Sequence, residues 1–219
     1  MSALTVHSIP GSPFGRAVLV ALEEKGARYR FRAVAPGALK SPAHLAIHPF
    51  GRVPVLEDGE FRVYETQAIL RYLDRTLPGP ALTPAAPRLA ARMDQLMNVN
   101  DWYLFPGVNS VIGFQRVVGP KLLGLVPDEA AIAGAMPKAH AVIAEISAAL
   151  GAQRFLAGEA LSLADALLGP QLDFLRMTPE WAVLAAGHRN LDGWLERLNA
   201  RPSFAATTWD RVEGLARAG

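Results

Sequence analysis

The sequence contains no cysteine among its 219 residues. Disulfides, thiolate metal sites and any mechanism in which the protein supplies its own nucleophilic sulfur are therefore excluded. A thiol–disulfide oxidoreductase that works through its own sulfur is excluded for the same reason.

A strong charge of one sign is also missing. The 22 Lys and Arg residues are scattered among 20 Asp and Glu residues, which gives a net charge of +2. This pattern lacks the footprint of a nucleic-acid-binding surface, so we predict no nucleic-acid partner. Four of the histidines show no mutual ligand spacing, and we expect no metal site. They are His7, His44, His140 and His188.

Long hydrophobic runs are absent near the start of the sequence. The apolar stretch at 3–9 follows no basic segment and is too short for a signal peptide or a membrane span. We therefore predict a cytoplasmic protein with no membrane partner. The hydrophobic fraction of 51% fits a globular chain with one large core or two modest ones.

The first part of the sequence alternates strand and helix signals. Ser12 is a favoured N-cap, Pro13 suits the first helical position, and Gly26 closes the helix that they begin. Asp58-Gly59 between alternating apolar runs predicts a two-residue hairpin loop. The predicted order is a strand (4–9), a helix (13–25), a strand (29–34), a short helix after Ser41-Pro42, two hairpin strands (53–57 and 60–64) and a helix that ends before Pro78. This order predicts one mixed sheet.

No strand pattern returns after the proline-rich stretch that ends at Pro87. Helices are predicted near 88–118, 128–150, 162–177 and 190–200. Ser162 and Asp165 have the spacing of a capping box, with Asp in place of Glu, and Pro170 is expected to bend the helix that they begin. The predicted fold class is thus an α/β N-terminal domain followed by an all-α C-terminal domain.

Two motifs carry a resemblance to a known family. Residues 9–22, with Pro10, Ser12 and Arg16, resemble the opening of the cytosolic glutathione transferases that use a serine. Residues 48–59 and 64–69 are similar to the glutathione-binding signature of that family, and the resemblance extends over essentially the whole chain. It is closest to the plant-type serine classes and their bacterial relatives, and the lack of cysteine excludes a cysteine-dependent class.

The resemblance implies how the chain is divided. It implies a thioredoxin-like, glutathione-binding domain at 1–78, a linker at 79–86 and an all-helical domain at 87–219 that contributes the electrophile pocket. The pattern of strands and helices predicts the same division independently.

The resemblance also implies roles for single residues. Ser12 would donate a hydrogen bond to the glutathione sulfur. Val53 would pair its backbone with the cysteinyl unit of the tripeptide, and Pro54 would be the cis proline that shapes that edge. Taken alone, Ser12 is equally an ordinary helix cap.

The ends of the tripeptide would be held by charged and hydroxyl groups. Glu65 would bind the γ-glutamyl amino group and Thr66 its carboxylate, whereas Lys40 and Arg52 would face the glycine carboxylate. Leu39 stands where a histidine is common in the plant-type class, which removes one donor near the glycine end. Taken singly, Glu65 is an acid that complements a helix dipole, Thr66 a cap, and the two cations are ordinary surface residues.

Aromatic residues are candidates for an apolar pocket that would bind the electrophile, with core packing as the alternative. They are Phe14, Trp102, Tyr103, Phe105 and Phe114.

The implied function is activation of the glutathione thiolate for attack on apolar electrophiles in detoxification, with glutathione as co-substrate, no metal, and a homodimer. Two alternatives stay open. One is a glutathione-dependent isomerase or peroxidase, and the other is a non-catalytic binding module on the same fold.

Overall fold

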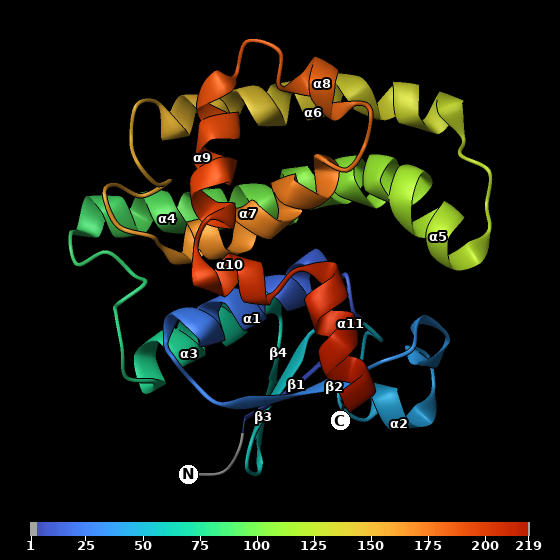
Figure 1. Ribbon diagram of the computed structural model, residues 1–219, viewed down its shortest axis with the longest axis vertical. Helices are drawn as coiled ribbons and strands as arrows, with labels where there is room; N and C mark the ends of the chain where they lie inside the picture. The colour runs from blue at the N-terminus through green and yellow to red at the C-terminus, as the bar shows by residue number, and fades with distance from the viewer. Residues whose placement is uncertain (1–3, 219) are drawn as a thin grey trace. The chain divides into compact units, whose positions relative to one another are not determined.

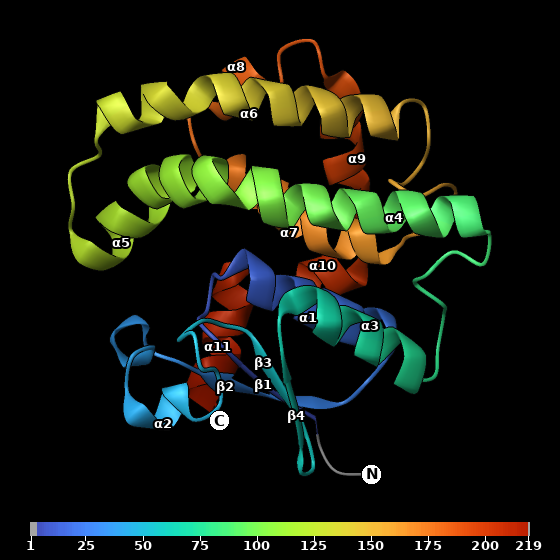
Figure 2. The same cartoon turned by 180° about the vertical axis from the view of Figure 1, so that it is seen from behind.

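The computed structural model describes residues 4–218 (Figures 1 and 2). The chain forms two compact units: residues up to Leu82 form the first together with those from Asn199 onward, and Thr83–Leu198 form the second. The sequence places 199–219 with the helical domain, whereas the contacts group this stretch with the first unit. The outermost residues of the predicted domains, 1–3 and 219, lie outside the described residues. The assignment of glutathione binding to residues 1–78 and of the electrophile pocket to residues 87–219 remains a prediction.

A mixed sheet of four strands in the order β2-β1-β3-β4 forms the centre of the first unit. Strand β1 pairs in parallel with β2 and antiparallel with β3, and β3 pairs antiparallel with β4. The predicted α/β domain with a mixed sheet is thus confirmed. The strands are β1 (Leu4–Ser8), β2 (Tyr29–Ala33), β3 (Val55–Asp58) and β4 (Phe61–Tyr64).

The hairpin differs from its prediction by one position. Asp58 pairs with Phe61, so the two loop residues are Gly59 and Glu60 rather than Asp58 and Gly59. Gly59 takes φ 61°, which glycine adopts without a steric penalty. Strand β3 begins at Val55 instead of at 53, and the preceding Pro54 has no N–H to contribute to the ladder.

Two helices lie side by side on one face of the sheet (Figures 1 and 2). Ser12 caps the first, as predicted, and both bury one apolar face against the strands, where Val6 and Leu56 are fully buried. Removal of this apolar surface from water drives the packing of the unit. The helices are α1 (Pro13–Glu24) and α3 (Thr66–Thr76), and the short helices η1 (Pro36–Ala38) and α2 (Pro42–Leu45) lie between β2 and β3 in the chain.

The C-terminal stretch is attached to α1 by ionic and polar contacts. Arg201 donates two hydrogen bonds to the carboxylate of Glu24, each 2.7 Å long, and Ser203 donates a third. Arg16 donates to the carbonyl oxygen of Phe204 at 3.3 Å and its guanidinium lies over the phenyl ring. The stretch contains α10 (Pro202–Ala206) and α11 (Trp209–Ala218), neither of which was predicted from the sequence.

The regular secondary structure of the second unit consists of helices, as predicted, apart from one isolated β-bridge between Phe155 and Gly158. The segment η2 is interrupted at Pro106 and Gly107, which have non-helical dihedrals, and α6 and α7 lie along it (Figures 1 and 2). No helix among residues 4–218 has the length and apolarity needed to cross a membrane. The helices are α4 (Pro87–Val99), η2 (Asn100–Val118), α5 (Gly119–Leu123), α6 (Glu129–Leu150), α7 (Leu163–Leu175), α8 (Trp181–Leu184) and α9 (Arg189–Asn199).

The predicted capping box at the start of α7 is present. Asp165 is fully buried and accepts from the N–H and the hydroxyl of Ser162 at 2.9 and 2.7 Å. It also accepts from the N–H of Leu156 at 2.9 Å and the indole of Trp194 at 2.8 Å. Burial raises the pKa of Asp165, and these hydrogen bonds oppose the rise. The Asp165 carboxyl thus links the loop at Leu156, the N-cap of α7 at Ser162 and helix α9 at Trp194.

Candidate functional site

Three segments with predicted site residues meet at one edge of the sheet. His7 near the end of β1 pairs with Val55 at the start of β3, and Val55 pairs with Tyr64 at the end of β4. The loop after β1, the segment before β3 and the segment after β4 therefore emerge together. These segments carry Ser12, Val53-Pro54 and Glu65-Thr66 respectively.

Ser12 lies at the N-terminus of α1. Its Oγ accepts a hydrogen bond from the N–H of Gly15 at 3.2 Å, which satisfies one of the free donors of the first turn. The Ser12 side chain is half-buried, and its O–H donates to no partner within residues 4–218. The hydroxyl can accept this hydrogen bond and still donate one to a ligand, because it has one donor and two acceptor lone pairs.

The peptide bond between Val53 and Pro54 is cis, which is the isomer that the family resemblance implied. Pro54 is buried, and Val53 is half-buried. Within the described part of the chain, neither the N–H nor the C=O of Val53 has a hydrogen-bond partner. This geometry leaves both groups able to pair with an extended peptide as an added strand.

Glu65 and Thr66 form the start of α3. Glu65 has φ 70°, the one positive φ among the non-glycine residues at positions 4–218, and such strain is often found at functional sites. The Glu65 side chain is exposed, whereas Thr66 is only 6% exposed. Thr66 is the first residue of the helix, where free main-chain N–H groups and the helix dipole favour an anion.

The two predicted cations, Lys40 and Arg52, flank a close contact between the main chains of Leu39 and Gly51. Gly51 has φ 62°, and a Cβ there would lie 2.6 Å from the carbonyl oxygen of Leu39, so only glycine fits. This contact brings the Lys40 segment against Arg52. The Lys40 ammonium donates to the carbonyl oxygen of Phe50 at 3.0 Å, and both cationic side chains are exposed.

Two buried histidines beside these segments, His44 and His48, were not predicted as site residues. The imidazole Nε2 of His44 lies 2.8 Å from the carbonyl oxygen of Arg52. Because a carbonyl only accepts, that nitrogen carries the proton. His44 thereby holds the main chain just before Val53. Its spacing of four residues from His48 was the signal available in the sequence.

His48 is 2% exposed, and its ring lies 4.7 Å from the ring of Tyr64. Its Nδ1 has no partner among the described residues. Burial lowers the pKa of His48, the carboxylate of Glu65 opposes this, and His44 and Arg52 lower it further. The imidazole is therefore neutral near pH 7.

The aromatic candidates fall in both units. Phe14 lies in the first turn of α1 and is half-buried, whereas Trp102 and Tyr103 on η2 are 71% and 56% exposed. Phe105 and Phe114, also on η2, are half-buried. The high exposure of Trp102 and Tyr103 argues against core packing for these two. The apolar pocket itself stays a prediction.

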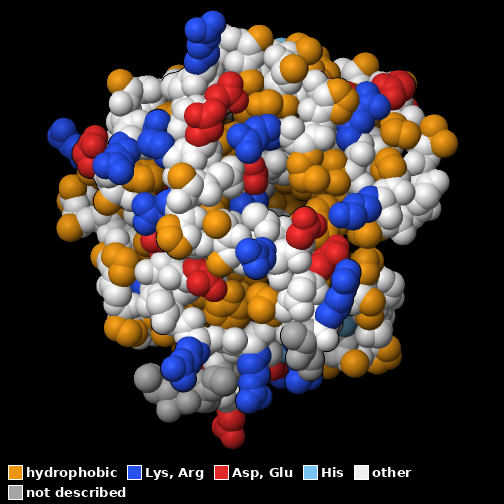
Figure 3. All heavy atoms as spheres, in the orientation of Figure 1, with side chains coloured by type: hydrophobic (Ala, Val, Ile, Leu, Met, Phe, Trp, Pro, Cys, Tyr) orange, Lys and Arg blue, Asp and Glu red, His pale blue; other side chains and the backbone are white. Residues whose placement is uncertain are grey.

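The face in Figure 3 carries Lys and Arg side chains interspersed with Asp and Glu, with no continuous patch of one sign. Within residues 4–218, no three His, Asp or Glu side chains come together as metal ligands would.

Two family models and a curated relative match the chain. Residues 2–75 match the model of the glutathione S-transferase N-terminal domain, and residues 110–202 match that of the C-terminal domain. Glutathione S-transferase 3 of Zea mays is 33% identical over 213 residues, which cover 94% of each chain.

Two solved structures are similar along most of their length. The apo form of glutathione S-transferase III has a TM-score of 0.83 and 34% identity, with 94% of this chain and 95% of that chain covered. The theta-class glutathione S-transferase of Xanthomonas axonopodis pv. citri, with glutathione bound, has a TM-score of 0.81 and 30% identity, with 95% and 98% covered. The fold, the matched domains and these relatives together establish that the chain belongs to the glutathione S-transferase family.

Proposed function

We propose that this glutathione S-transferase binds glutathione at the sheet edge where β1, β3 and β4 meet, and that Ser12 keeps its sulfur as a thiolate for attack on an apolar electrophile. The observation that carries the proposal is the state of the Ser12 hydroxyl. The Ser12 oxygen accepts a hydrogen bond from the N–H of Gly15, which fixes the orientation of the side chain. The hydroxyl proton remains available for donation to the glutathione sulfur.

The energy required is within reach of this arrangement. Each unit by which the thiol pKa falls corresponds to about 1.4 kcal/mol of preferential thiolate binding. A fall from roughly 8.5 to near 6.5 thus needs about 3 kcal/mol. A hydrogen bond to a charged group supplies about 1.5–3 kcal/mol, and the start of a helix adds more. No protein general base is required.

The rest of the tripeptide has matching groups nearby. The free N–H and C=O of Val53 would pair with the cysteinyl unit, and the hydroxyl and N–H groups at Thr66 would bind the γ-glutamyl carboxylate. Glu65 would bind the adjacent amino group. Lys40 and Arg52 would face the glycine carboxylate, since the contact at Gly51 brings their segments together. Phe14, Trp102, Tyr103, Phe105 and Phe114 would bind the electrophile.

The chemical step then needs little from the protein. The thiol proton passes to water as glutathione binds, and the sulfur uses its electron pair to form a carbon–sulfur bond with the electrophile. A leaving group departs with its bonding pair, or a proton from water completes an addition. Ser12 holds the sulfur in place throughout, because its hydrogen bond is stronger to the anion than to the neutral thiol.

Replacement of Ser12 tests the proposal. We expect Ser12→Ala to lower kcat with a general electrophile at least about tenfold, because the thiolate stabilisation is lost. Glutathione should still bind, because the groups that hold the ends of the tripeptide are untouched. Ser12→Thr keeps the hydroxyl and the cap and should retain most of the activity.

The matched control is Asp128→Ala, which removes another N-cap whose oxygen accepts from the N–H of Ala131 at 3.0 Å on the second unit. It should cost a similar amount of stability, about 1 kcal/mol, with no change in kcat. Unchanged turnover in Ser12→Ala would reject the role of Ser12.

Other uses of the same bound thiolate are separated by assay. Purified protein is tested with one electrophile, one isomerisable substrate and one hydroperoxide, and the preferred reaction identifies the class. Calorimetric titration with glutathione tests whether the protein is an enzyme of this kind at all. Absence of binding at millimolar glutathione would favour a non-catalytic module.

We also propose that the protein is a homodimer in which the helical domain of one copy meets the first domain of the other. In support, Phe50 beside the Lys40 segment is 62% exposed, and Trp102 and Tyr103 are exposed on η2. Large apolar side chains in the open are typical of protein interfaces.

A further inference from the structure

The C-terminal helix contacts the loop that carries Ser12. Trp209 is the first residue of α11, and its indole lies directly on the main chain of Gly11. A Cβ built at Gly11 would collide with three atoms of that ring: Cε2, Cδ2 and Cζ2. The ring therefore occupies the space above the residue that immediately precedes the candidate catalytic serine.

Gly11 occupies a critical position in a turn. The N–H of Ser12 donates to the carbonyl oxygen of Ile9 at 3.0 Å, which makes 9–12 a β-turn with Pro10 and Gly11 at its centre. Gly11 has φ 84°, the value that a type II turn requires at its third residue. A turn of this kind can change type through a flip of the peptide between Pro10 and Gly11. A ring seated on Gly11 opposes such a flip.

Trp209 is itself held in place. Its indole N–H donates to the carboxylate of Glu213 at 2.6 Å, one turn along α11. Val212 on the same helix is 4% exposed, and Thr207 just before it is buried and donates to the carbonyl oxygen of Ser203 at 2.8 Å. Ser203 bonds to Glu24 on α1. The segment is thus fixed to the same helix that Ser12 caps.

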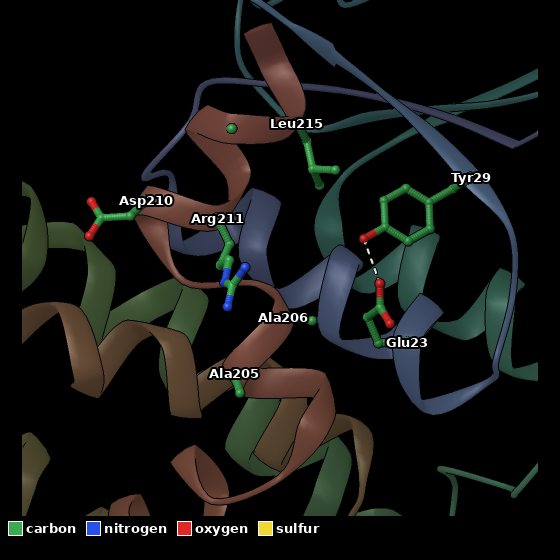
Figure 4. A pocket seen from close by; sticks show the side chains of 8 residues that line it. Glu23, Tyr29, Ala205, Ala206, Asp210, Arg211 and Leu215 are labelled. Atoms are coloured by element: carbon green, nitrogen blue, oxygen red, sulfur yellow. Dashed lines mark hydrogen bonds between the residues drawn. The ribbon is translucent and has the colours of Figure 1, made fainter. Parts of the chain in front are cut away.

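The opposite side of α11 is open. A cleft of about 650 Å³ lies between α11, α1 and β2, with Leu215, Ala205 and Ala206 among its walls (Figure 4). Leu215 points into this space and is 42% exposed. The side of α11 that bears Leu215 thus borders this cleft, whereas Trp209 contacts Gly11.

We infer that Trp209 is a positioning residue for the thiolate site, acting through Gly11 on Ser12. The indole holds the turn at 9–12 in one conformation and so fixes the position of the Ser12 main chain. Together with the hydrogen bond from Gly15, this determines the direction of the Ser12 hydroxyl. The C-terminal helix is thereby part of the glutathione-activating apparatus. This inference rests on the proposed function.

The experiment measures the pH at which the thiol of bound glutathione ionises, from thiolate absorbance at saturating glutathione, together with kcat and KM. For Trp209→Ala we expect the midpoint to rise by about one unit and kcat to fall about tenfold at neutral pH. The KM for glutathione should stay within about threefold, because the groups that hold the ends of the tripeptide are untouched. Trp209→Phe keeps a ring on Gly11 and should remain close to the unaltered protein.

Trp181→Ala is the matched control. Trp181 is a buried tryptophan of the second unit whose indole N–H bonds to a carboxylate, that of Asp192. Its loss should lower stability without moving the midpoint. Glu213→Ala is a second, milder variant that keeps the ring but removes its hydrogen bond to Glu213, and it should raise the midpoint by a smaller amount.

The outcomes separate the two proposals. If Ser12→Ala raises the midpoint but Trp209→Ala and Glu213→Ala leave it unchanged, the inference about Trp209 is overturned and the proposed function stands. If Ser12→Ala also leaves it unchanged, the proposed function fails. Should Trp209→Ala not fold, the midpoint of Glu213→Ala alone decides.

Discussion

Single side chains near the site combine a structural and a chemical task. Ser12 caps a helix with its oxygen and keeps its proton available. The cap was predicted from Ser12 and Pro13, whereas the donor role was implied by the family resemblance. His44 and His48 were not predicted as part of the site. Their roles depend on the carbonyl of Arg52, which contacts His44, and on the ring of Tyr64, which contacts His48. Local sequence patterns do not contain that information.

His44 provides a prediction at this scale. In His44→Ala the carbonyl of Arg52 loses its donor, so the segment before Val53 becomes less ordered and glutathione binds less tightly. We expect the KM for glutathione to rise about five- to tenfold with a smaller change in kcat. His44→Gln keeps an N–H donor and should restore much of the binding. An unchanged KM in His44→Ala would show that the hydrogen bond has no part in binding.

Among the secondary-structure elements, the strands and helices of the first unit up to α3 were predicted well because their caps and turn residues are local signals. The end of the chain was not. Helices α10 and α11 are short, and their attachment to α1 depends on contacts between residues such as Arg201 and Glu24, which are distant in sequence. The hairpin loop was misplaced by one residue because Gly59 fits either position of the turn.

The attachment of α10 to α1 should depend on pH. Burial alone would raise the pKa of Glu24, but the hydrogen bonds from Arg201 and Ser203 bring it below its ordinary value of 4.5. A carboxyl whose pKa is lower in the folded state stabilises the fold above its unfolded pKa, and this contribution is lost as the pH falls through the folded pKa. We expect Glu24→Gln to lower Tm near pH 7, and the difference from the unaltered protein to shrink as the pH falls below 4.5 and through the lowered pKa of Glu24. A difference that persists in acid would contradict the ionic explanation.

The start of α7 allows a second prediction for an element. Asp165→Ala leaves the buried N–H groups of Leu156 and Ser162 and the indole of Trp194 without their acceptor, so we expect the free energy of unfolding to fall by about 3 kcal/mol or more. Asp128→Ala, an exposed cap, should cost only about 1 kcal/mol. Denaturant titration of both variants measures the contrast, and equal losses would refute the central role of Asp165.

At the scale of the whole molecule, the proposed dimer makes the last prediction. Phe50→Ser removes an exposed ring and should weaken self-association about tenfold or more in sedimentation equilibrium, because large aromatic side chains often dominate interface energies. Phe61→Ser is the control, since Phe61 is also exposed on the first unit, at 50%. A dimer of unchanged affinity in Phe50→Ser would remove this residue from the interface.

The first unit is discontinuous in the sequence, and this has a consequence for biosynthesis. Its sheet and its first helices are made before the second unit, whereas Arg201 and Trp209 are translated after it. The second unit, lying wholly between these segments, can fold while translation continues. The turn before Ser12 acquires its aromatic cover only after Trp209 has emerged from the ribosome, so a translation product that stops before this residue would hold a folded sheet and still lack a finished site.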